Sequence, residues 1–210
     1  MQPLKLVVVS AGLGKPSSTR LLGDRLAEAT RRGLAGRDVA ADVQVVELRD
    51  VAVDIANNLL TGFPAPGLRA AIEAVTEADA LIAVTPIFTA SYSGLFKSFF
   101  DVLDNTALVG KPVLIAATGG TARHSLALEH ALRPLFAYLR ATVAPTAVYA
   151  ATDDWGSGAA AGTDGLGARI TRAGGELADL AGRVPRTAPR RAPIDEVVPF
   201  AEQLAALRRG

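Results

Sequence analysis

Residues 6–26 constrain the fold of this chain more than any other stretch. Leu6 and the three valines after it form a short, unbroken apolar run, which is typical of a central parallel strand covered on both faces. A loop of glycines and hydroxyls follows, and Pro16 with the next three hydroxyl residues supplies start signals for a helix. The segment predicts a buried strand, a loop and an amphipathic helix whose apolar face carries Leu21, Leu22, Leu26 and Ala29.

The loop between this strand and this helix is rich in hydroxyl groups. A helix N-terminus presents unpaired N–H groups and the positive end of a dipole, so it suits an anion. We therefore predict a phosphorylated ligand there, although a plain turn with a helix cap explains the same residues. The hydroxyl residues expected to converge on the phosphate are Ser10, Ser17, Ser18 and Thr19.

Two familiar phosphate-binding loops do not fit this sequence. A dinucleotide-binding GxGxxG motif needs a glycine where Ser17 stands, and no acidic residue follows at a strand end about 20 residues later. The GxxxxGK[ST] loop fails because Val9 takes the first glycine position and Pro16 follows Lys15. A hydroxyl-rich loop for a monophosphate remains.

Composition excludes several classes of function. The chain has 210 residues, half of them hydrophobic, enough for one α/β domain with its own core. A net charge of +1 gives no electrostatic footprint for nucleic acid. With no cysteine and two histidines, we expect no metal site, and redox chemistry would need an organic cofactor. No apolar run reaches the roughly 18 residues of a membrane span, so we expect a cytoplasmic protein without membrane contact.

Strand and helix patterns alternate along the rest of the chain. Further strands are predicted at residues 43–48, 80–85, 113–117 and 145–150, a helix at 68–75, and an irregular segment at 49–66. Right-handed crossovers then favour a five-stranded parallel sheet of order 2-1-3-4-5. In that order the loops after the first and third strands flank the switch point, where open α/β sheets bind ligands.

Residues 85–104 supply the second part of the predicted site. A proline is expected to end the third strand, and Ser93 with Gly94 starts an aromatic-rich helix. The strand exit offers rigid backbone and apolar surface for a planar ring, although it could simply pack beneath the helix. The residues expected to contact the ring are Pro86, Ile87, Phe88 and Thr89.

The fourth strand leads into a loop with adjacent glycines, Thr118, Gly119, Gly120 and Thr121. Glycines admit close approach of the backbone to a ligand, but they could also only turn the chain. His124 and His130 follow, and we interpret both as surface or capping residues of the next helix rather than catalytic groups. Pro134 is expected to kink that helix or to end its regular part.

The segment from Thr85 to Asp101, TPIFTASYSGLFKSFFD, resembles the NADPH-dependent FMN reductases of the flavodoxin-like superfamily. The family pattern runs approximately [ST]-P-x-Y-x-x-S-x-S-G-x-L-K-x-x-x-D. Phe88 replaces the tyrosine, so the hydrogen bond of a phenol is lost, and Phe96 stands where a leucine precedes Lys97. The similarity extends over residues 4–150, and the long first loop resembles an actinobacterial-type subgroup of flavin reductases.

This resemblance implies a flavodoxin-like three-layer sandwich and a cytoplasmic oxidoreductase, an NAD(P)H-dependent FMN reductase. It implies FMN and NAD(P)H as ligands, with hydride passing to the flavin and the reduced flavin supplied to a flavin-dependent monooxygenase. It also implies that Thr118, Gly119 and Gly120 lie beside the flavin ring. No catalytic acid or base is expected, since hydride transfer requires positioning.

Three other functions are compatible with the same residues. A flavodoxin-type electron carrier would bind flavin without NAD(P)H turnover, but such carriers are commonly short and strongly acidic. A quinone or azo-dye reductase on the same fold would differ in its preferred acceptor. A flavodoxin-like domain with a decayed site would serve only as an assembly partner.

The C-terminal third carries predictions of its own. Trp155 lies in a loop rich in glycine, alanine and aspartate, and could cover the nicotinamide, contact another subunit or anchor the loop. We expect a helix at residues 166–183 to close a flavin-binding domain spanning 1–183, followed at 184–210 by a Pro/Arg linker and a terminal helix. The aromatic-rich helix at 94–103 has more apolar faces than one sheet covers, so we expect it to form a homodimer or homotetramer interface.

Overall fold

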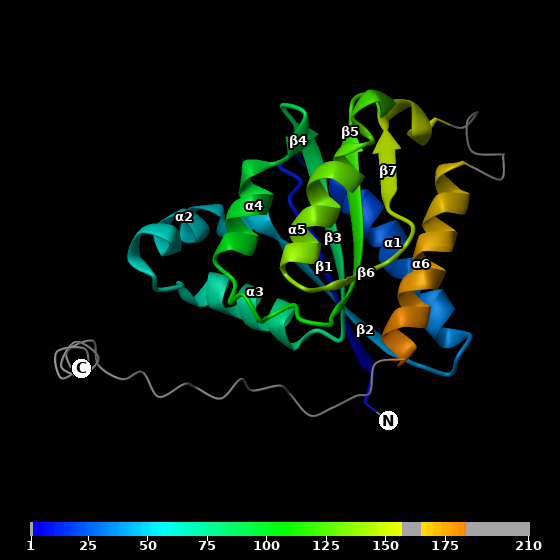
Figure 1. Ribbon diagram of the computed structural model, residues 1–210, viewed down its shortest axis with the longest axis horizontal. Helices are drawn as coiled ribbons and strands as arrows, with labels where there is room; N and C mark the ends of the chain where they lie inside the picture. Colours follow the sequence, from blue (N-terminus) through cyan, green and yellow to red (C-terminus); the bar gives the residue numbers. More distant parts are fainter. Residues whose placement is uncertain (1, 157–164, 184–210) are drawn as a thin grey trace, which may run out of the picture.

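The computed structural model describes residues 2–156 and 165–183 (Figure 1). The predicted linker and terminal helix at 184–210 lie outside the described residues. The helices are α1 (Ser18–Ala35), α2 (Ala52–Thr61), α3 (Pro66–Glu77), α4 (Gly94–Asp101), α5 (Arg133–Tyr138) and α6 (Leu166–Arg183). The strands are β1 (Leu4–Ser10), β2 (Ala41–Glu47), β3 (Ala80–Phe88), β4 (Ser91–Tyr92), β5 (Pro112–Gly119), β6 (Thr142–Val143) and β7 (Val148–Ala151).

The sheet has the expected flavodoxin-like order but more strands than predicted. It is 7-stranded, and its path runs β2-β1-β3-β5-β6, with β7 also pairing with β5 and β4 pairing with β3. All pairs except the β3–β4 hairpin are parallel. The fifth strand, predicted at residues 145–150, corresponds to β7, which begins only at Val148, and the short β6 before it was not predicted. Both β6 and β7 lie along β5.

The interruption between β6 and β7 is fixed by a contact with α6. Pro145 has no N–H for a sheet hydrogen bond, and the backbone N–H of Thr146 donates to the Glu176 carboxylate at 2.7 Å. The Thr146 hydroxyl donates to the same carboxylate at 2.8 Å. Glu176 therefore replaces the partner that a continuous strand would have supplied.

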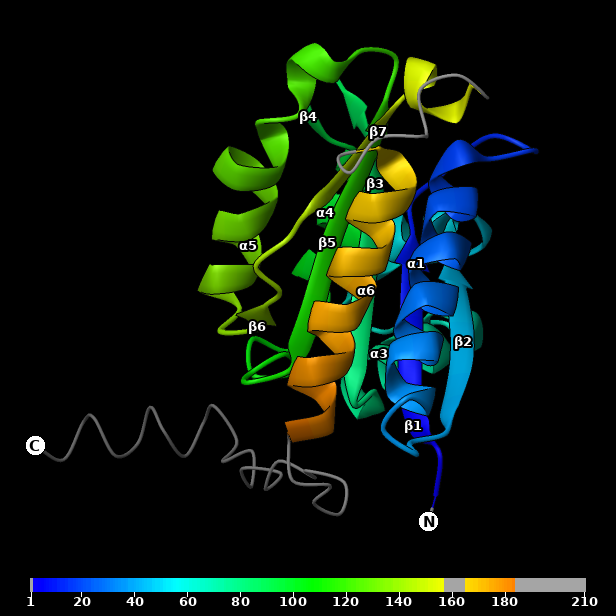
Figure 2. The same cartoon turned by 90° about the vertical axis from the view of Figure 1, so that its right-hand side faces the viewer.

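Helices cover both faces of the sheet. Alternate residues of β1 point to opposite faces, so Val8 packs with α1 and α6, and Val9 packs with α2, α3, α4 and α5. Figure 2 shows α1 and α6 side by side along one face. Burial on both faces explains why β1, β3 and β5 are continuous apolar runs.

The segment predicted to be irregular, residues 49–66, contains a helix. A 3-10 turn at Leu48–Val51 leads into α2, which ends at Gly62 with φ 76 and with its N–H bonded to the Asn58 carbonyl. Asn57 and Asn58 favoured the prediction of an irregular segment. However, asparagine in a helix interior lowers helix stability by well under about 1 kcal/mol relative to alanine. The left-handed conformation of Gly62 ends α2. Ile55 is the buried residue of this helix and packs in the core.

Strand β3 continues through Pro86, where a strand end was predicted. Val84 accepts from the Ala11 N–H, and Ser10–Val84 is the last β1–β3 pair. Backbone polar groups of a strand alternate between its two neighbours, so Pro86, two residues after Val84, also faces the β1 side. Strand β1 has already ended there, so the missing N–H of Pro86 removes no sheet hydrogen bond. The strand then folds back into the β3–β4 hairpin.

The helix that follows β5 changes its hydrogen bonding before its proline. Leu128–Leu132 form a π-helix, in which the Arg133 N–H donates to the Leu128 carbonyl. Pro134 lies in the first turn of α5, where a missing N–H is tolerated. The irregularity that was predicted at Pro134 is therefore a π-helix that ends just before this proline, and a regular α-helix continues after it.

The aromatic residues of α4 are covered by the chain itself, contrary to the reasoning that made this helix an interface. Phe96, Phe99 and Phe100 are buried. The rings of Phe96 and Phe100 lie 4.8 Å apart, and Phe100 meets Phe136 of α5 edge-on at 5.0 Å. Large exposed apolar side chains occur on and after α2 instead, at Val53, Leu59, Leu60 and Phe63.

One lysine is buried at the opposite edge of the sheet from the predicted site. The Lys111 ammonium donates to the carbonyls of Val75 at 2.6 Å and Thr76 at 2.8 Å. These are C-terminal carbonyls of α3, which lack partners within the helix. Burial lowers the pKa of Lys111 to about 8, and the nearby charge of Asp79 opposes that shift.

Candidate functional site

The predicted ligand-binding segments meet at the carboxyl ends of β1, β3 and β5. The chain leaves β1 for β2 on one side and later returns to β3 on the other, so β1 and β3 form the switch point. The loop at residues 11–17, the β3–β4 hairpin and the loop after β5 all follow these strand ends. Figure 1 shows the hairpin and the end of β5 at the same edge of the sheet.

The hydroxyl-rich loop has a buried polar atom without a partner. Ser10 is 1% exposed, and its Oγ has no hydrogen-bond partner. Ser17 is the N-cap of α1, and its Oγ accepts from the Arg20 N–H at 3.1 Å, which leaves its own hydroxyl hydrogen free to donate. Ser18 is exposed at the start of the helix. A buried unpaired hydroxyl is unfavourable without a ligand, so this end suits an anion.

Gly12 determines how closely the loop approaches the helix cap. A Cβ at this position would lie 2.1 Å from Ser17 Oγ and 3.0 Å from the Thr19 Cβ. No side chain fits there, because real Cβ contacts are not that short. This role of Gly12 was not predicted, because nothing in the sequence marks it apart from the other glycines of the loop.

A hydrogen bond joins the first turn of α1 to the carboxyl end of β5. Thr19 Oγ1 lies 2.8 Å from Thr118 Oγ1, and both residues are buried. Thr19 was expected to hold phosphate, but its hydroxyl already has a partner in the protein. The bond brings together two parts of the predicted site that are far apart in the chain.

The β3–β4 hairpin forms a second wall. Pro86 pairs with Thr118 on β5, Ile87 is half-buried, and Phe88 is 48% exposed. Thr89 and Ala90 have φ values of 49 and 68, the conformation that a two-residue hairpin turn requires. The hairpin thus presents Phe88 and Thr89 beyond the end of the sheet.

The base of this hairpin is held by hydroxyl groups. The Ser93 N–H donates to Thr85 Oγ1 at 3.1 Å, and Thr85 Oγ1 donates to the Pro86 carbonyl at 2.9 Å. Ser93 also caps α4, because its Oγ accepts from the Phe96 N–H at 3.2 Å. The hairpin and α4 are therefore fixed to the same point of β3.

Tyr149 of β7 supports the loop after β5. Its hydroxyl donates to the Thr121 carbonyl at 2.9 Å, and a Cβ at Gly119 would lie 2.1 Å from that hydroxyl oxygen. Burial raises the pKa of Tyr149, so the phenol stays protonated. Tyr149 was missed because its sequence pattern is that of an ordinary strand residue. Gly120 has open space around a Cβ.

Trp155 is an anchor on the α1 side of the sheet. The Arg25 guanidinium lies 5.1 Å from the centre of its ring, a cation–π geometry. The adjacent Asp154 accepts from the Ala151 N–H at 2.8 Å and from Arg169 at 3.1 Å. Of the three interpretations of Trp155, these contacts favour the loop anchor.

The histidines and acidic residues do not gather into a metal-binding cluster in the described part of the chain. His124 and His130 are exposed, and residues 2–156 and 165–183 contain no cluster of histidine, aspartate or glutamate suited to a metal. No helix within these residues is long and apolar enough to span a bilayer.

The geometry fits a ligand with a phosphate at one end and a flat ring at the other. The phosphate end would rest on the N-terminus of α1 beside the unpaired Ser10 hydroxyl. The ring end would lie between the hairpin and the loop after β5, where a Cβ at Gly120 would meet only open space. The phosphate cradle consists of neutral donors, as the dipole of a helix N-terminus permits.

Comparison with known proteins identifies the relatives of this chain. Residues 4–156 match the family described as NADPH-dependent FMN reductase. A Pseudomonas aeruginosa protein named FMN reductase (NADPH) is 39% identical over 153 residues, which cover 73% of this chain and 80% of that protein. A Pseudomonas fluorescens protein named NADH-dependent FMN reductase SfnF is 38% identical over 154 residues, with the same two shares, 73% and 80%.

A solved structure is also similar. The X-ray structure of an oxidoreductase from Corynebacterium diphtheriae is 44% identical to this chain and superposes with a TM-score of 0.83. The match covers 88% of this chain and 100% of that one.

Proposed function

This chain belongs to the NADPH-dependent FMN reductase family, and from that premise we propose that it transfers hydride from NAD(P)H to FMN. The observation that carries the proposal is the buried, unpaired Ser10 hydroxyl at the switch point of the sheet. A phosphate at the N-terminus of α1 would give this hydroxyl its missing acceptor.

We assign the phosphate of FMN to the first loop. Ser10 and Ser17 donate through their hydroxyls, and Ser18 and Thr19 contribute the first N–H groups of α1. The Thr19 hydroxyl, bonded to Thr118, orients the helix rather than the phosphate. Gly12 keeps the loop close enough for these groups to converge.

We assign the flavin ring to the space between the other two loops. Pro86, Ile87, Phe88 and Thr89 supply one wall, and Thr118, Gly119 and Gly120 supply backbone N–H groups for the ring's carbonyl oxygens. Bound FMN supplies the chemistry, because its N5 accepts a hydride from a nicotinamide. The protein's contribution is to hold the ring and leave one face open to the nicotinamide at reacting distance.

Anaerobic mixing of the full chain and FMN with NADPH or NADH tests the proposal. Multiple-turnover bleaching of the flavin band near about 450 nm is expected, and the faster nicotinamide identifies the preferred one. Flavin binding without bleaching would instead favour an electron carrier, and absence of flavin binding would leave only the fold. Much faster turnover with quinones or azo dyes than with flavin would favour a quinone or azo-dye reductase.

We also propose that the reduced flavin is passed to a flavin-dependent monooxygenase, and that the reaction takes place in the cytoplasm, where NAD(P)H is available. The flavin-binding domain is assigned to residues 1–183. Residues 184–210 are assigned to a linker and a C-terminal helix.

Self-association as a homodimer or homotetramer remains part of the proposal, with a different surface. The aromatic residues of α4 are already buried, whereas Leu60 and Phe63 at the end of α2 are 87% and 81% exposed. Such adjacent apolar side chains favour an interface. A monomeric mass in light scattering at micromolar concentration would exclude it.

A further inference from the structure

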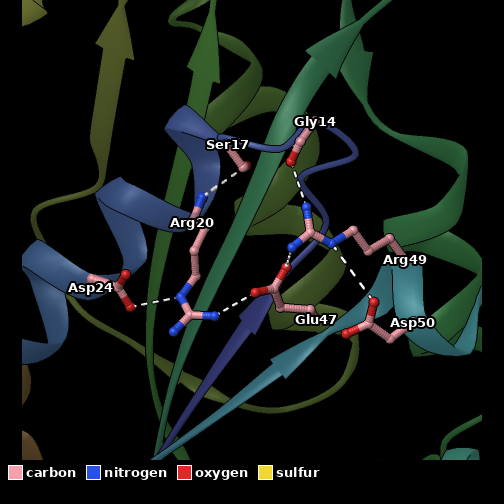
Figure 3. Close-up of polar contacts among 7 residues, drawn as sticks. All are labelled: Gly14, Ser17, Arg20, Asp24, Glu47, Arg49 and Asp50. Atoms are coloured by element: carbon pink, nitrogen blue, oxygen red, sulfur yellow. Dashed lines mark hydrogen bonds and ion pairs between the residues drawn. The ribbon is translucent and has the colours of Figure 1, made fainter.

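Glu47 lies between two arginines beside the phosphate loop (Figure 3). It is the last residue of β2 and is opposite Ser10 in the β1–β2 register. One carboxylate oxygen accepts from Arg20 Nη1 at 2.5 Å, and the other forms an ion pair with Arg49 Nη2. The side chains of Glu47 and Arg49 are only 15% and 17% exposed. We call these three residues the Glu47 network.

The two arginines connect Glu47 to both ends of the loop. Arg49 Nη1 donates to the Gly14 carbonyl at 2.5 Å. Arg20 lies in the first turn of α1, and its backbone N–H donates to the N-cap hydroxyl of Ser17 at 3.1 Å. Gly14 in the loop and the first turn of α1 are thus both connected, each through one arginine, to the carboxylate of Glu47 at the end of β2.

The loop has little else to fix its conformation. Residues 13–16 are exposed, and an open hollow of about 300 Å³ borders the loop at Gly14, Ser17, Arg20 and Arg49. Within the part of the chain that the structure describes, the Arg49 bond is the hydrogen bond that joins residues 12–16 to another element. Apolar packing therefore does not hold this segment.

Each arginine of the Glu47 network also has a carboxylate outside the network beside it. Asp24 accepts from Arg20 Nε at 2.8 Å, and its hydrogen bond, followed by the contribution of Glu47, holds the pKa of Arg20 above its ordinary value. Arg49 faces Glu47 and Asp50. Neither guanidinium is left as a free positive charge for a phosphate, which favours a role in positioning over one in direct attraction.

We propose that Arg49 and Glu47 are positioning residues that hold the phosphate loop in its ligand-binding conformation, and so set the preference for FMN over riboflavin. The inference rests on the proposed function. A loop already ordered before binding loses less conformational entropy when the phosphate arrives. Riboflavin has no phosphate, so its affinity does not depend on this loop.

Flavin fluorescence titrations of the full chain with FMN and with riboflavin test this. Arg49→Gln is expected to raise the Kd for FMN by about tenfold, the scale of an ordering effect, and to change the Kd for riboflavin less than about twofold. Arg49→Lys should lie between wild type and Arg49→Gln, because an ammonium cannot bond Gly14 and Glu47 with the geometry of a guanidinium. At saturating FMN, kcat should stay unchanged while the KM for FMN rises.

Arg133 provides a matched control. It pairs with Glu129 and donates to the backbone carbonyls of Ala144 and Pro145 at 3.2 and 3.1 Å, but it lies on α5, away from the loop. Arg133→Gln should therefore lower the Tm about as much as Arg49→Gln does, but it should change neither the Kd for FMN nor the Kd for riboflavin.

Each outcome decides the inference. Equal weakening of FMN and riboflavin by Arg49→Gln, or a loss of Tm with both Kd values unchanged, would overturn it. If Arg49→Gln does not fold, Arg49→Lys and Glu47→Gln give the same comparison. A wild-type protein that binds riboflavin and FMN equally would overturn the inference and the assignment of the phosphate to the first loop, but not hydride transfer to a flavin. A protein that binds neither would overturn the proposed function as well.

Discussion

Thr19 Oγ1 of α1 lies 2.8 Å from Thr118 Oγ1 at the end of β5. The two side chains are 3% and 4% exposed, so neither hydroxyl has water as a substitute partner. The bond crosses the carboxyl end of β3 and connects the loop assigned to the phosphate with the loop assigned to the ring. Both halves of the site therefore share one internal contact.

Removal of one hydroxyl of this pair should destabilise the protein. Thr118→Val or Thr19→Val leaves the other hydroxyl buried without a partner, which costs about 1–3 kcal/mol of the free energy of unfolding. The double variant should lose less than the sum of the two, since no unpaired group remains. Urea unfolding of all four proteins measures this coupling, and strictly additive losses would show that the hydroxyls do not interact.

Ser17→Ala should weaken FMN much more than riboflavin. The substitution removes both the N-cap of α1 and a hydroxyl assigned to the phosphate, and a lost cap alone reduces stability by about 1 kcal/mol. We expect at least about a tenfold rise in the Kd for FMN, as for a lost charge-assisted hydrogen bond. Ser93→Ala removes a comparable cap from α4 and serves as the control for the loss of a cap. Equal losses for the two flavins would contradict the assignment.

Two adjacent glycines of α6 should respond oppositely to alanine. A Cβ at Gly174 would lie 2.6 Å from the Cβ of Ala29 and 2.8 Å from the backbone N of Thr30 in α1. Such overpacking costs about 1–3 kcal/mol. Gly175 has nothing within 4 Å of a Cβ, so Gly175→Ala should stabilise by about 0.5–1 kcal/mol through helix propensity. Chemical denaturation measures both, and changes of the same sign would contradict the packing of α1 against α6.

The buried Lys111 predicts a stability that rises with pH. Its pKa falls from 10.5 in the unfolded chain to about 8 in the folded protein. Between these values the unfolded state binds more protons, so the free energy of unfolding increases with pH. Relative to Lys111→Met, which does not titrate, the wild type should gain up to about 3 kcal/mol across this window. Urea unfolding at several pH values tests this. A wild type that loses stability relative to Lys111→Met as pH rises would contradict it.

The alternation of strands and helices was readable from the sequence because each central strand is buried on both faces. Helix α6 begins where its pattern predicted, at Leu166. The order of the sheet followed from right-handed crossovers. The late start of β7 and the separate β6 were not readable, because the interruption between them depends on Glu176, which lies 30 residues after Thr146.

The predicted site residues lie at the switch point, but their roles were only partly visible. Ser10 and Ser17 are marked by local signals, a strand end and a helix cap. Gly12 and Tyr149 are not, because each acts through a neighbour that the sequence places elsewhere. The end of β3 was placed too early, since the effect of Pro86 depends on where β1 stops.

The contact between Arg25 and Trp155 makes the protein its own optical probe. The chain contains one tryptophan, so all indole emission originates from this one position between α1 and the loop after β7. Oxidised flavin absorbs light in the region where tryptophan emits, and energy transfer to a bound flavin would dim that emission. Occupancy of the site can therefore be followed in the unlabelled protein, even with the flavin's own fluorescence quenched.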